Sequence, residues 1–383
     1  MKTFSLDKFP AGRYEEINDY KYFVPEKINR EWTWKDATIN KLLEDAARKI
    51  GMLNSFSHLV PYLDQFLQLH LTNEAVYSSR IEGTRTEIEE AILSKEYIAK
   101  ERRDDWQEVH NYIEAMNYAI ERLKYLPLST RLIRETHKIL LSNVRGTNRN
   151  PGEFRHSQNW IGGLNPASAM YVPPLHNYIP ELMSDLENFI HNDNLNVPHL
   201  IKIAIIHYQF ESIHPFLDGN GRIGRLLITL YLIDKKLIDR PLLALSVAFE
   251  KNKLEYYYQL NNVRKTNILT EWVKYFLTSI IQAADFTAEI LESMIDLKNH
   301  LEQKIREQAG QRAGNASKLL NNLFKQPSIQ IKDAASILGL TYKSASELVN
   351  LLTQLSILQE ITHRKRNRLF VFDPYVKLFK RFS

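Results

Sequence analysis

The sequence predicts a mainly helical protein that ends in a small unit of helices and strands. Its 383 residues contain only 13 glycines and 14 prolines, and apolar residues recur at helical spacing through most of the chain. Two stretches interrupt this pattern: residues 151–174, which are rich in Gly, Pro, Asn and Ser, and residues 309–317. The first predicts a long loop inside the helical part, and the second predicts the start of a C-terminal domain.

Length and composition bound the kind of protein this can be. A chain of 383 residues favours two or three domains, and 44% hydrophobic with 25% charged residues is typical of a globular protein. No apolar run approaches the length that spans a bilayer, so we do not expect a membrane protein. The chain has no cysteine, and its first residues lack the apolar stretch of a secretory signal, which together predict a cytoplasmic protein. A net charge of +5 argues only weakly for an acidic partner.

The helical patterns predict four divisions of the chain. Leu42, Ala46 and Ile50 share one helical face, as do Ile203, Ile206 and Phe210 further on, and a charged helical segment begins near Asp296. The expected divisions are an N-terminal helical region, a main domain, a linker helix and a C-terminal domain, at residues 1–95, 96–290, 291–312 and 313–383.

The long loop of the main domain is predicted to close into a β-hairpin. Its two extended-looking pieces are residues 158–161 and 169–172, and turn-forming residues lie between them. Its loop-like flanks set the hairpin apart from the helices on either side.

The C-terminal domain shows a different order of elements. Three helical patterns near residues 318–324, 331–338 and 343–355 precede two strand-like runs at residues 358–362 and 368–372. Three helices and a hairpin within about seventy residues are typical of a winged helix-turn-helix domain.

This domain is also basic, and a basic turn joins its two strands. DNA is therefore one expected partner, because such a turn lies where a wing would touch the phosphate backbone. Few residues near 342–352 are typical of base readout, so docking of another protein stays an equal alternative. The basic residues concerned are Lys332, Lys343, His363, Arg364, Lys365, Arg366, Arg368, Lys377, Lys380 and Arg381.

The segment that carries the chemistry reads AIIHYQFESIHPFLDGNGRIGRLLITL, over residues 204–230. Gly219, Gly221 and Gly224 would let backbone amides approach a ligand closely, at a helix N-terminus that favours phosphate oxygens. Arg222 and Arg225 lie one helical turn apart and could clamp the outer phosphates. The segment therefore predicts a site for a polyphosphate such as ATP.

Two further residues indicate that this site catalyses a reaction. Asp218 is the only carboxylate inside the positive loop, and one acid beside phosphates typically holds Mg²⁺. His214 opens the loop, and a neutral imidazole is suited to take a proton from an attacking hydroxyl. Each of these residues alone could serve a cap, a turn or a solvated face, but their combination with clustered glycines favours a catalytic site.

The residues from His214 to Arg225 resemble the signature HPFx[D/E]GNGRxxR of the Fic (filamentation induced by cAMP) family. Similarity continues upstream through RGTNRNPGEFR, NWIGG and YVPP, and downstream through YYQLNNVR, so it covers roughly residues 74–277. The resemblance implies a Fic-type helical bundle with a β-hairpin flap. It also implies a protein adenylyltransferase, which moves AMP from ATP to a Ser, Thr or Tyr hydroxyl of a target protein.

The resemblance assigns roles within the loop. His214 would act as the base, Asp218 would bind Mg²⁺, and Arg225 would hold the γ-phosphate. Asn220, with the loop amides, and Arg222 would hold the other phosphates. The hydroxyl would attack the α-phosphorus and pyrophosphate would leave, with positioning and charge neutralisation supplying most of the catalysis.

Other parts of the site are implied less specifically. Tyr257 and Asn261 resemble the segment that borders the adenine and ribose, although the neighbouring tyrosines fit equally well as core aromatics. In the flap, Met170, Tyr171 and Val172 would contact an extended stretch of the target, as in β-strand addition, or would pack the hairpin onto the core.

An inhibitory motif precedes the catalytic loop. Ser78 and Glu82 lie four residues apart on one helical face and Gly83 follows, which matches the family's inhibitory pattern (S/T)xxxE(G/N). A Glu82 carboxylate paired with Arg225 would occupy the guanidinium that the γ-phosphate needs. At an effective dielectric near 20 this attraction is about 4 kcal/mol before desolvation is subtracted.

Three alternatives stay open. The same glutamate could position water and remove AMP from modified proteins. A DNA-binding regulator whose Fic-like part only senses a nucleotide is a second possibility, although sensing would not require His214. Finally, the chain could act alone or as a homodimer.

Overall fold

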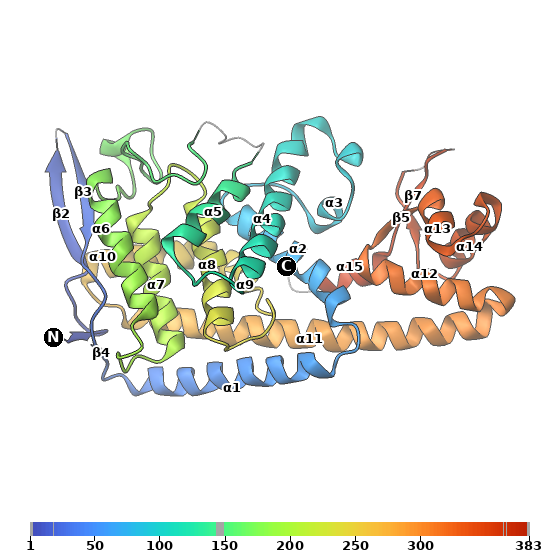
Figure 1. The fold of residues 1–383 in the computed structure, drawn as a ribbon, viewed down its shortest axis with the longest axis horizontal. Coiled ribbons are helices and arrows are strands. Elements are labelled where there is room, and N and C mark those ends of the chain that lie inside the picture. The colour runs from blue at the N-terminus through green and yellow to red at the C-terminus, as the bar shows by residue number, and fades with distance from the viewer. Residues whose placement is uncertain (1–2, 18, 143–148, 363, 365, 381–383) are drawn as a thin grey trace.

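The computed structural model describes residues 3–17, 19–142, 149–362, 364 and 366–380, and the protein is mainly helical. Figure 1 shows an elongated molecule whose length is set by one long helix, α11, with the C-terminal elements at one end and the N-terminal hairpin at the other. The helices of the main body are α1 Ala37–Leu59, α2 Leu63–Ile81, α3 Ile88–Ala91, α4 Arg103–Arg122, α5 Thr130–Leu140, α6 Ile179–His191, α7 His199–Ile213, α8 Asn220–Asp234, α9 Leu245–Lys251, α10 Lys253–Thr266 and α11 Thr270–Gln308.

Short strands precede the helices. An antiparallel hairpin pairs β2 with β3, and a short parallel pair joins β1 to β4. Phe23 of the hairpin donates a backbone hydrogen bond to Val172 O at 2.9 Å, which ties the N-terminal hairpin to the loop of residues 151–174. The strand bounds are β1 Phe4–Ser5, β2 Gly12–Ile17, β3 Tyr20–Pro25 and β4 Trp32–Thr33.

Helix α11 supports the rest of the body. Its first half packs against α1, α7 and α9, and its second half carries the C-terminal elements (Figure 1). Trp272 is fully buried on this helix and its Nε1 donates to Ala204 O of α7 at 2.8 Å. The helix runs without a break from Thr270 to Gln308, so the division expected at residues 290/291 lies within it, and the expected linker is the second half of this one helix.

Helix α7 lies at the centre of the body. All of residues 200–213 are buried, which explains why apolar side chains occupy every face of this helix. The polar residue His207 has a partner on each side: Nδ1 lies 3.0 Å from Gly224 O and Nε2 lies 2.8 Å from the hydroxyl of Tyr256. These contacts join α7 to α8 and α10.

The C-terminal unit contains the three predicted helices. It also contains both predicted strands, and each strand is shorter than predicted. It adds a strand and a final helix, β5 and α15, that the sequence did not predict. The antiparallel sheet has the strand order β5-β7-β6. His363, Lys365 and Arg381 of the predicted basic surface lie outside the described residues. The bounds are α12 Ala313–Lys325, β5 Ser328–Gln330, α13 Ile331–Leu338, α14 Tyr342–Gln354, β6 Gln359–Glu360, β7 Leu369–Val371 and α15 Asp373–Lys380.

This unit is docked on the body beside α2. Ser328 Oγ donates to Ile92 O at 2.9 Å, and Gln330 Nε2 donates to the hydroxyl of Tyr97 at 2.7 Å. Phe379 of α15 stacks on Phe66 of α2 with ring centroids 5.9 Å apart. The C-terminal unit therefore contacts both α2 and the segment that follows it.

The predicted β-hairpin of the long loop is reduced to one antiparallel bridge, between Ile161 and Tyr171. A single 3₁₀ turn, Pro166–Ser168, lies between these two residues. The extended pieces are too short to add further ladder bonds, because Gly162 and Gly163 adopt positive φ directly after the bridge. Residues 145–148, part of the similarity to the Fic signature, lie outside the described residues. Among the described helices, none combines the length and apolar character needed to cross a bilayer.

Replacing Trp272 with alanine should lower the free energy of unfolding by about 3–5 kcal/mol, because it removes a fully buried ring between α11 and α7. Chemical denaturation followed by circular dichroism measures the change. The exposed Leu254 provides the control, since Leu254→Ala should change stability by less than about 0.5 kcal/mol. Equal stability of both variants would contradict the central role of α11.

Candidate active site

The predicted catalytic loop joins the C-terminal end of α7 to the N-terminal end of α8. His214 ends α7 in the left-handed conformation, with φ 49°, and Gly219 precedes α8 with φ 74°. A left-handed residue at each end turns the chain sharply between two buried helices. The turn brings His214 and the first turn of α8 into one small region.

Hydrogen bonds within the loop fix its shape. Asn220 uses both ends of its amide on one residue: Oδ1 accepts from Phe216 N at 2.8 Å, and Nδ2 donates to Phe216 O at 2.8 Å. Asn220 was predicted to hold phosphates together with the loop amides. In the structure its side chain holds the loop through these two bonds, and its role toward phosphates stays a prediction.

His137 of α5 braces the same loop, and no sequence pattern pointed to it. Its ring stacks on Phe216 with centroids 3.7 Å apart. Gly152 N donates to His137 Nδ1 at 2.8 Å, so the proton is on Nε2, which donates to Asp218 O at 3.0 Å. Burial lowers the pKa of His137 to about 4, which keeps the ring neutral in this arrangement.

Arg155 connects the long loop to the catalytic loop. It is buried, and its guanidinium donates to His214 O at 3.0 Å, to Ser157 O at 3.2 Å and to Pro174 O. Its own backbone N–H donates to Pro215 O at 2.9 Å. Burial lowers the pKa of Arg155 to about 10. The residue lies in a segment that resembles the Fic pattern, but the sequence assigned it no role.

Both predicted phosphate-binding arginines are buried on α8. Arg222 Nη1 lies 3.1 Å from Glu108 Oε2 of α4, and Nη2 lies 3.8 Å from Asp218 Oδ1. The side chain of Asp218 remains 45% exposed, and its Oδ1 accepts from Gly219 N at 2.6 Å. The structure thus brings Asp218 and Arg222 within 3.8 Å of each other, and their roles toward metal and phosphate stay predictions.

Arg225 is held by the helix that carries the predicted inhibitory motif. Its Nε donates to Ser78 Oγ at 2.9 Å, and Nη2 donates to Ser78 O at 2.8 Å and to Glu82 Oε1 at 2.7 Å. Burial raises the pKa of Glu82, but the charge and hydrogen bond of Arg225 lower it more, so the net pKa lies below its usual value. Glu82 is therefore ionised at neutral pH and paired with Arg225.

The carboxylate of Glu82 lies directly against the first turn of α8. A Cβ added to Gly221 would lie 2.2 Å from Glu82 Oε1, so a side chain at this position would displace the Glu82 carboxylate. A helix N-terminus favours an anion, and the Glu82 carboxylate lies at this position on α8. Gly83 follows the end of α2 with φ 103°, a conformation that favours glycine and turns the chain out of the helix direction.

His214 has the protonation state that a base needs. Its side chain is 16% exposed, and burial together with the charge of Arg155 lowers its pKa to about 3, against the opposing effect of Glu82. The imidazole is therefore neutral at pH 7 and can accept a proton.

Of the three predicted target-docking residues, only Met170 is available at the surface, with 75% of it exposed. Tyr171 and Val172 are buried, so their side chains pack onto the body, and a role of their backbone in target docking stays a prediction. The hydroxyl of Tyr171 donates to Ser212 O at 2.5 Å, and Arg264 lies over its ring at 3.7 Å. These contacts turn the side chain inward.

The predicted adenine-side residues lie near the inhibitory helix. The hydroxyl of Tyr257 donates to Ile81 O at 3.3 Å, directly before Glu82. Asn261 Oδ1 accepts from Arg264 Nη1 at 2.8 Å. Both residues come from α10, which packs beside the catalytic loop, and neither is fully buried.

The fit of the site to Mg²⁺ depends on Asp218. Among the described residues, no group of three His, Cys, Asp or Glu side chains could hold a metal ion. A single half-exposed carboxylate beside Arg222 fits an ion that arrives with phosphate oxygens as its other ligands. Asp218 is the residue that would hold it.

Comparison with known proteins agrees with this geometry. Residues 40–121 match the family described as Fic/DOC family N-terminal, and residues 127–232 match the Fic/DOC family. The second match contains the whole catalytic loop, and the first contains Ser78 and Glu82.

Curated relatives match over a shorter stretch. Proteins named protein adenylyltransferase Fic from Drosophila grimshawi and Drosophila erecta are 32% and 29% identical over 130 residues, which are 32% of this chain. The match covers 25% and 24% of those two proteins, so the chain spans about a quarter of their length.

Solved structures show the same fold over more of the chain. A Fic family protein from Desulfovibrio desulfuricans superposes with a TM-score of 0.56 and 20% identity, covering 88% of this chain and 96% of that protein. A Fic domain containing signaling protein from Bacteroides thetaiotaomicron gives 0.51 and 18%, covering 66% and 97%. The motif, the fold and the two family matches together place this chain in the Fic/DOC family.

Proposed function

We propose that this protein transfers AMP from ATP to a hydroxyl group of a target protein, and that Glu82 restrains the reaction. The observation that carries the proposal is the arrangement around the loop: neutral His214 at one end, and the first turn of α8 with Arg222 and Arg225 at the other. Curated relatives of the matched region are named protein adenylyltransferases, which supports the same reaction.

In this reaction His214 takes the proton of the target hydroxyl while that oxygen attacks the α-phosphorus. The bond from the α-phosphorus to the bridging oxygen breaks, and pyrophosphate leaves. Arg222 and the amides of α8 hold the phosphates in line, so positioning and electrostatics supply most of the rate enhancement. Mg²⁺ held by Asp218 would neutralise charge on the phosphate oxygens.

The restraint follows from competition for Arg225. Its Nη2 is paired with Glu82 at 2.7 Å, and the Glu82 carboxylate fills the space over Gly221. A γ-phosphate would need the same guanidinium and the same space. While Glu82 stays in place, ATP can bind only in a pose that misdirects its α-phosphorus.

Removal of AMP from a modified protein, with Glu82 positioning water, is the alternative reaction at this site. A cytoplasmic location and a homodimer remain expectations from the sequence.

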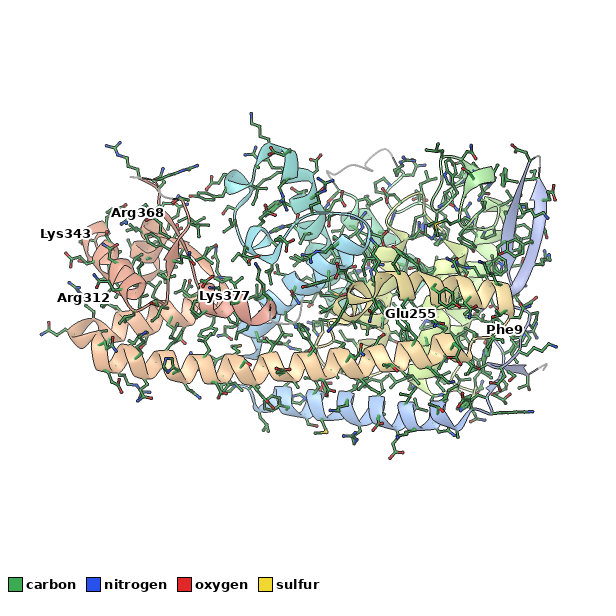
Figure 2. All side chains as sticks on the ribbon, turned by 180° about the vertical axis from the view of Figure 1, so that it is seen from behind. Phe9, Glu255, Arg312, Lys343, Arg368 and Lys377 are labelled. Carbon is green, nitrogen blue, oxygen red and sulfur yellow. The ribbon has the colours of Figure 1, made fainter. Side chains whose placement is uncertain are left out.

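We propose that the C-terminal unit is a winged helix-turn-helix domain. As a second function of the protein, we propose that this domain binds double-stranded DNA. The order of helices and antiparallel strands supports this type. Figure 2 shows Lys343 and Arg368 on this unit, far from Phe9 at the other end of the molecule. Arg364 and Arg366, in the turn between β6 and β7, are exposed and could reach a phosphate backbone.

Glu82→Gly should raise AMP transfer roughly 10–100-fold, because it frees Arg225 and the space over Gly221. The measurement is label retained on protein from ATP labelled at the α-phosphate, with γ-labelled ATP run in parallel. Glu87→Gly is the matched control, since Glu87 pairs with Arg80 at the surface, and it should leave activity unchanged.

Adding His214→Ala to the Glu82→Gly variant should abolish retention of the α label. Retention of the γ label would indicate a kinase-like reaction, and equal activity of Glu82→Gly and the natural chain would refute the restraint.

Asp218→Asn, in the Glu82→Gly background, should lower AMP transfer about 10–100-fold and raise the Mg²⁺ concentration needed for half-maximal rate. The loss of one negative charge beside the phosphates is the physical reason. Titration of the rate against Mg²⁺ measures the effect. Asp193→Asn, at an exposed position outside the loop, is the control, and an unchanged Mg²⁺ dependence of Asp218→Asn would remove Asp218 from the metal site.

Binding of a labelled duplex of about 20 base pairs, followed by fluorescence anisotropy, tests the C-terminal unit. Affinity should fall with salt, and the double variant Arg364→Glu, Arg366→Glu should weaken binding and reduce the salt slope by about 1 for each phosphate that these arginines neutralise. Lys124→Glu, which changes an exposed charge on the body, should have no effect. The absence of salt-dependent binding would refute the DNA function.

A further inference from the structure

Glu211 is a buried acid beside the catalytic histidine that the signature does not explain. It lies in the last turn of α7, and its side chain is only 8% exposed. Its Oε1 has no hydrogen-bond partner among the described residues. Burying a carboxylate with an unsatisfied oxygen is costly, so the position calls for a specific reason.

The carboxylate faces the ring nitrogen of His214 that does not serve as the base. Glu211 Oε2 lies 4.0 Å from His214 Nδ1, which is buried and makes no well-formed hydrogen bond among the described residues, and the backbone carbonyl of Glu211 also acts on the imidazole and raises its pKa. Glu211 lies in the last turn of α7, and His214 directly follows the helix in the left-handed conformation, so the turn at the helix end brings the two side chains near each other. A shift of about 1 Å would bring the two atoms into hydrogen-bond distance.

The helix opposite is shaped to admit this carboxylate. A Cβ added to Gly224 would lie 2.2 Å from Glu211 Oε1. Gly224 was predicted to give a phosphate access to the backbone, but it makes room for Glu211, as Gly221 makes room for Glu82. Two carboxylates therefore fill two gaps on α8, one over each glycine.

The charges around Glu211 come from three helices and connect it to the restraint. Burial raises the pKa of Glu211 to about 7, Arg225 of α8 and Arg264 of α10 lower it, and Glu82 of α2 raises it. Tyr256 and Tyr257 of α10 also interact with it. Without the negative charge of Glu82, the pKa of Glu211 would be lower and its ionised form more populated. Release of the restraint would therefore favour the charged form of the acid beside His214.

We propose that Glu211 is a positioning residue for His214: its carboxylate accepts a hydrogen bond from Nδ1–H, which keeps the proton on Nδ1 and leaves the Nε2 lone pair free for the target hydroxyl. This inference rests on the proposed AMP transfer. The hydroxyl proton passes to Nε2 as the oxygen bonds to the α-phosphorus and pyrophosphate leaves. The imidazolium that results is stabilised by the Glu211 carboxylate, and it later gives its Nε2 proton to solvent.

A purely structural role would look different. Glu211 could instead act only as a counter-charge for Arg225 and Arg264, both of which interact with it electrostatically. In that case its replacement would affect folding and ATP binding through the arginines, without changing the state of the His214 ring.

The test compares Glu211→Gln and Glu211→Asp in the Glu82→Gly background. Glu211→Gln should lower kcat about 10–100-fold and leave KM for ATP within about threefold. The acid limb of its kcat/KM profile should move to lower pH, because a neutral neighbour no longer favours the protonated ring. Glu211→Asp keeps the charge and should recover part of kcat. Raised KM with unchanged kcat would overturn the proposal in favour of the counter-charge role.

A second readout is independent of activity. Imidazole ¹⁵N spectra, assigned with His214→Ala, report which nitrogen of His214 carries the proton. We expect Nδ1–H in the Glu82→Gly protein and disappearance of that preference in its Glu211→Gln form. An unchanged His214 signal in Glu211→Gln would overturn the pairing. If the signal changes as expected but no variant retains α label, the pairing stands and AMP transfer is refuted.

Discussion

The ion pair that buries the guanidinium of Arg225 is the constraint on which the site depends. A buried charge needs acceptors, and Arg225 finds them on α2: Ser78 accepts from Nε and Nη2, and Glu82 accepts from Nη2, while Nη1 has no hydrogen-bond partner among the described residues. This requirement fixes α2 against the first turn of α8. It also explains why glycine stands at position 221, where any larger residue would collide with the Glu82 carboxylate.

Much of the site could be predicted because its residues are close in sequence. The segment from His214 to Arg225 carries the turn, the helix start and both arginines within a few residues, and the structure forms that turn. The four-residue spacing of Ser78 and Glu82 placed both on one helical face, and both contact Arg225. Helical periodicity likewise identified α7, α12, α13 and α14.

The residues that could not be predicted are those whose role depends on distant partners. His137 and Arg155 look like ordinary members of a helix and a loop until α5 and the long loop are folded against the catalytic loop. Tyr171 resembles an exposed hairpin residue in the sequence, but its hydroxyl finds Ser212 O and its ring lies under Arg264. Strand β5 is only three residues long and exists because β7 pairs with it.

The internal bracing of the loop has a consequence for how the protein would change state. Asn220 holds Phe216, and His137 holds Asp218, through bonds that do not involve α2. If Glu82 restrains the site as proposed, the loop keeps its shape without α2, and release would need only the parting of the Glu82–Arg225 pair. A binding event that discriminates between the two forms by about 5.5 kcal/mol would convert a population of about 1:99 into 99:1. Under the proposed restraint, a partner would therefore act on one contact at the end of α2, and the catalytic loop itself could stay as it is.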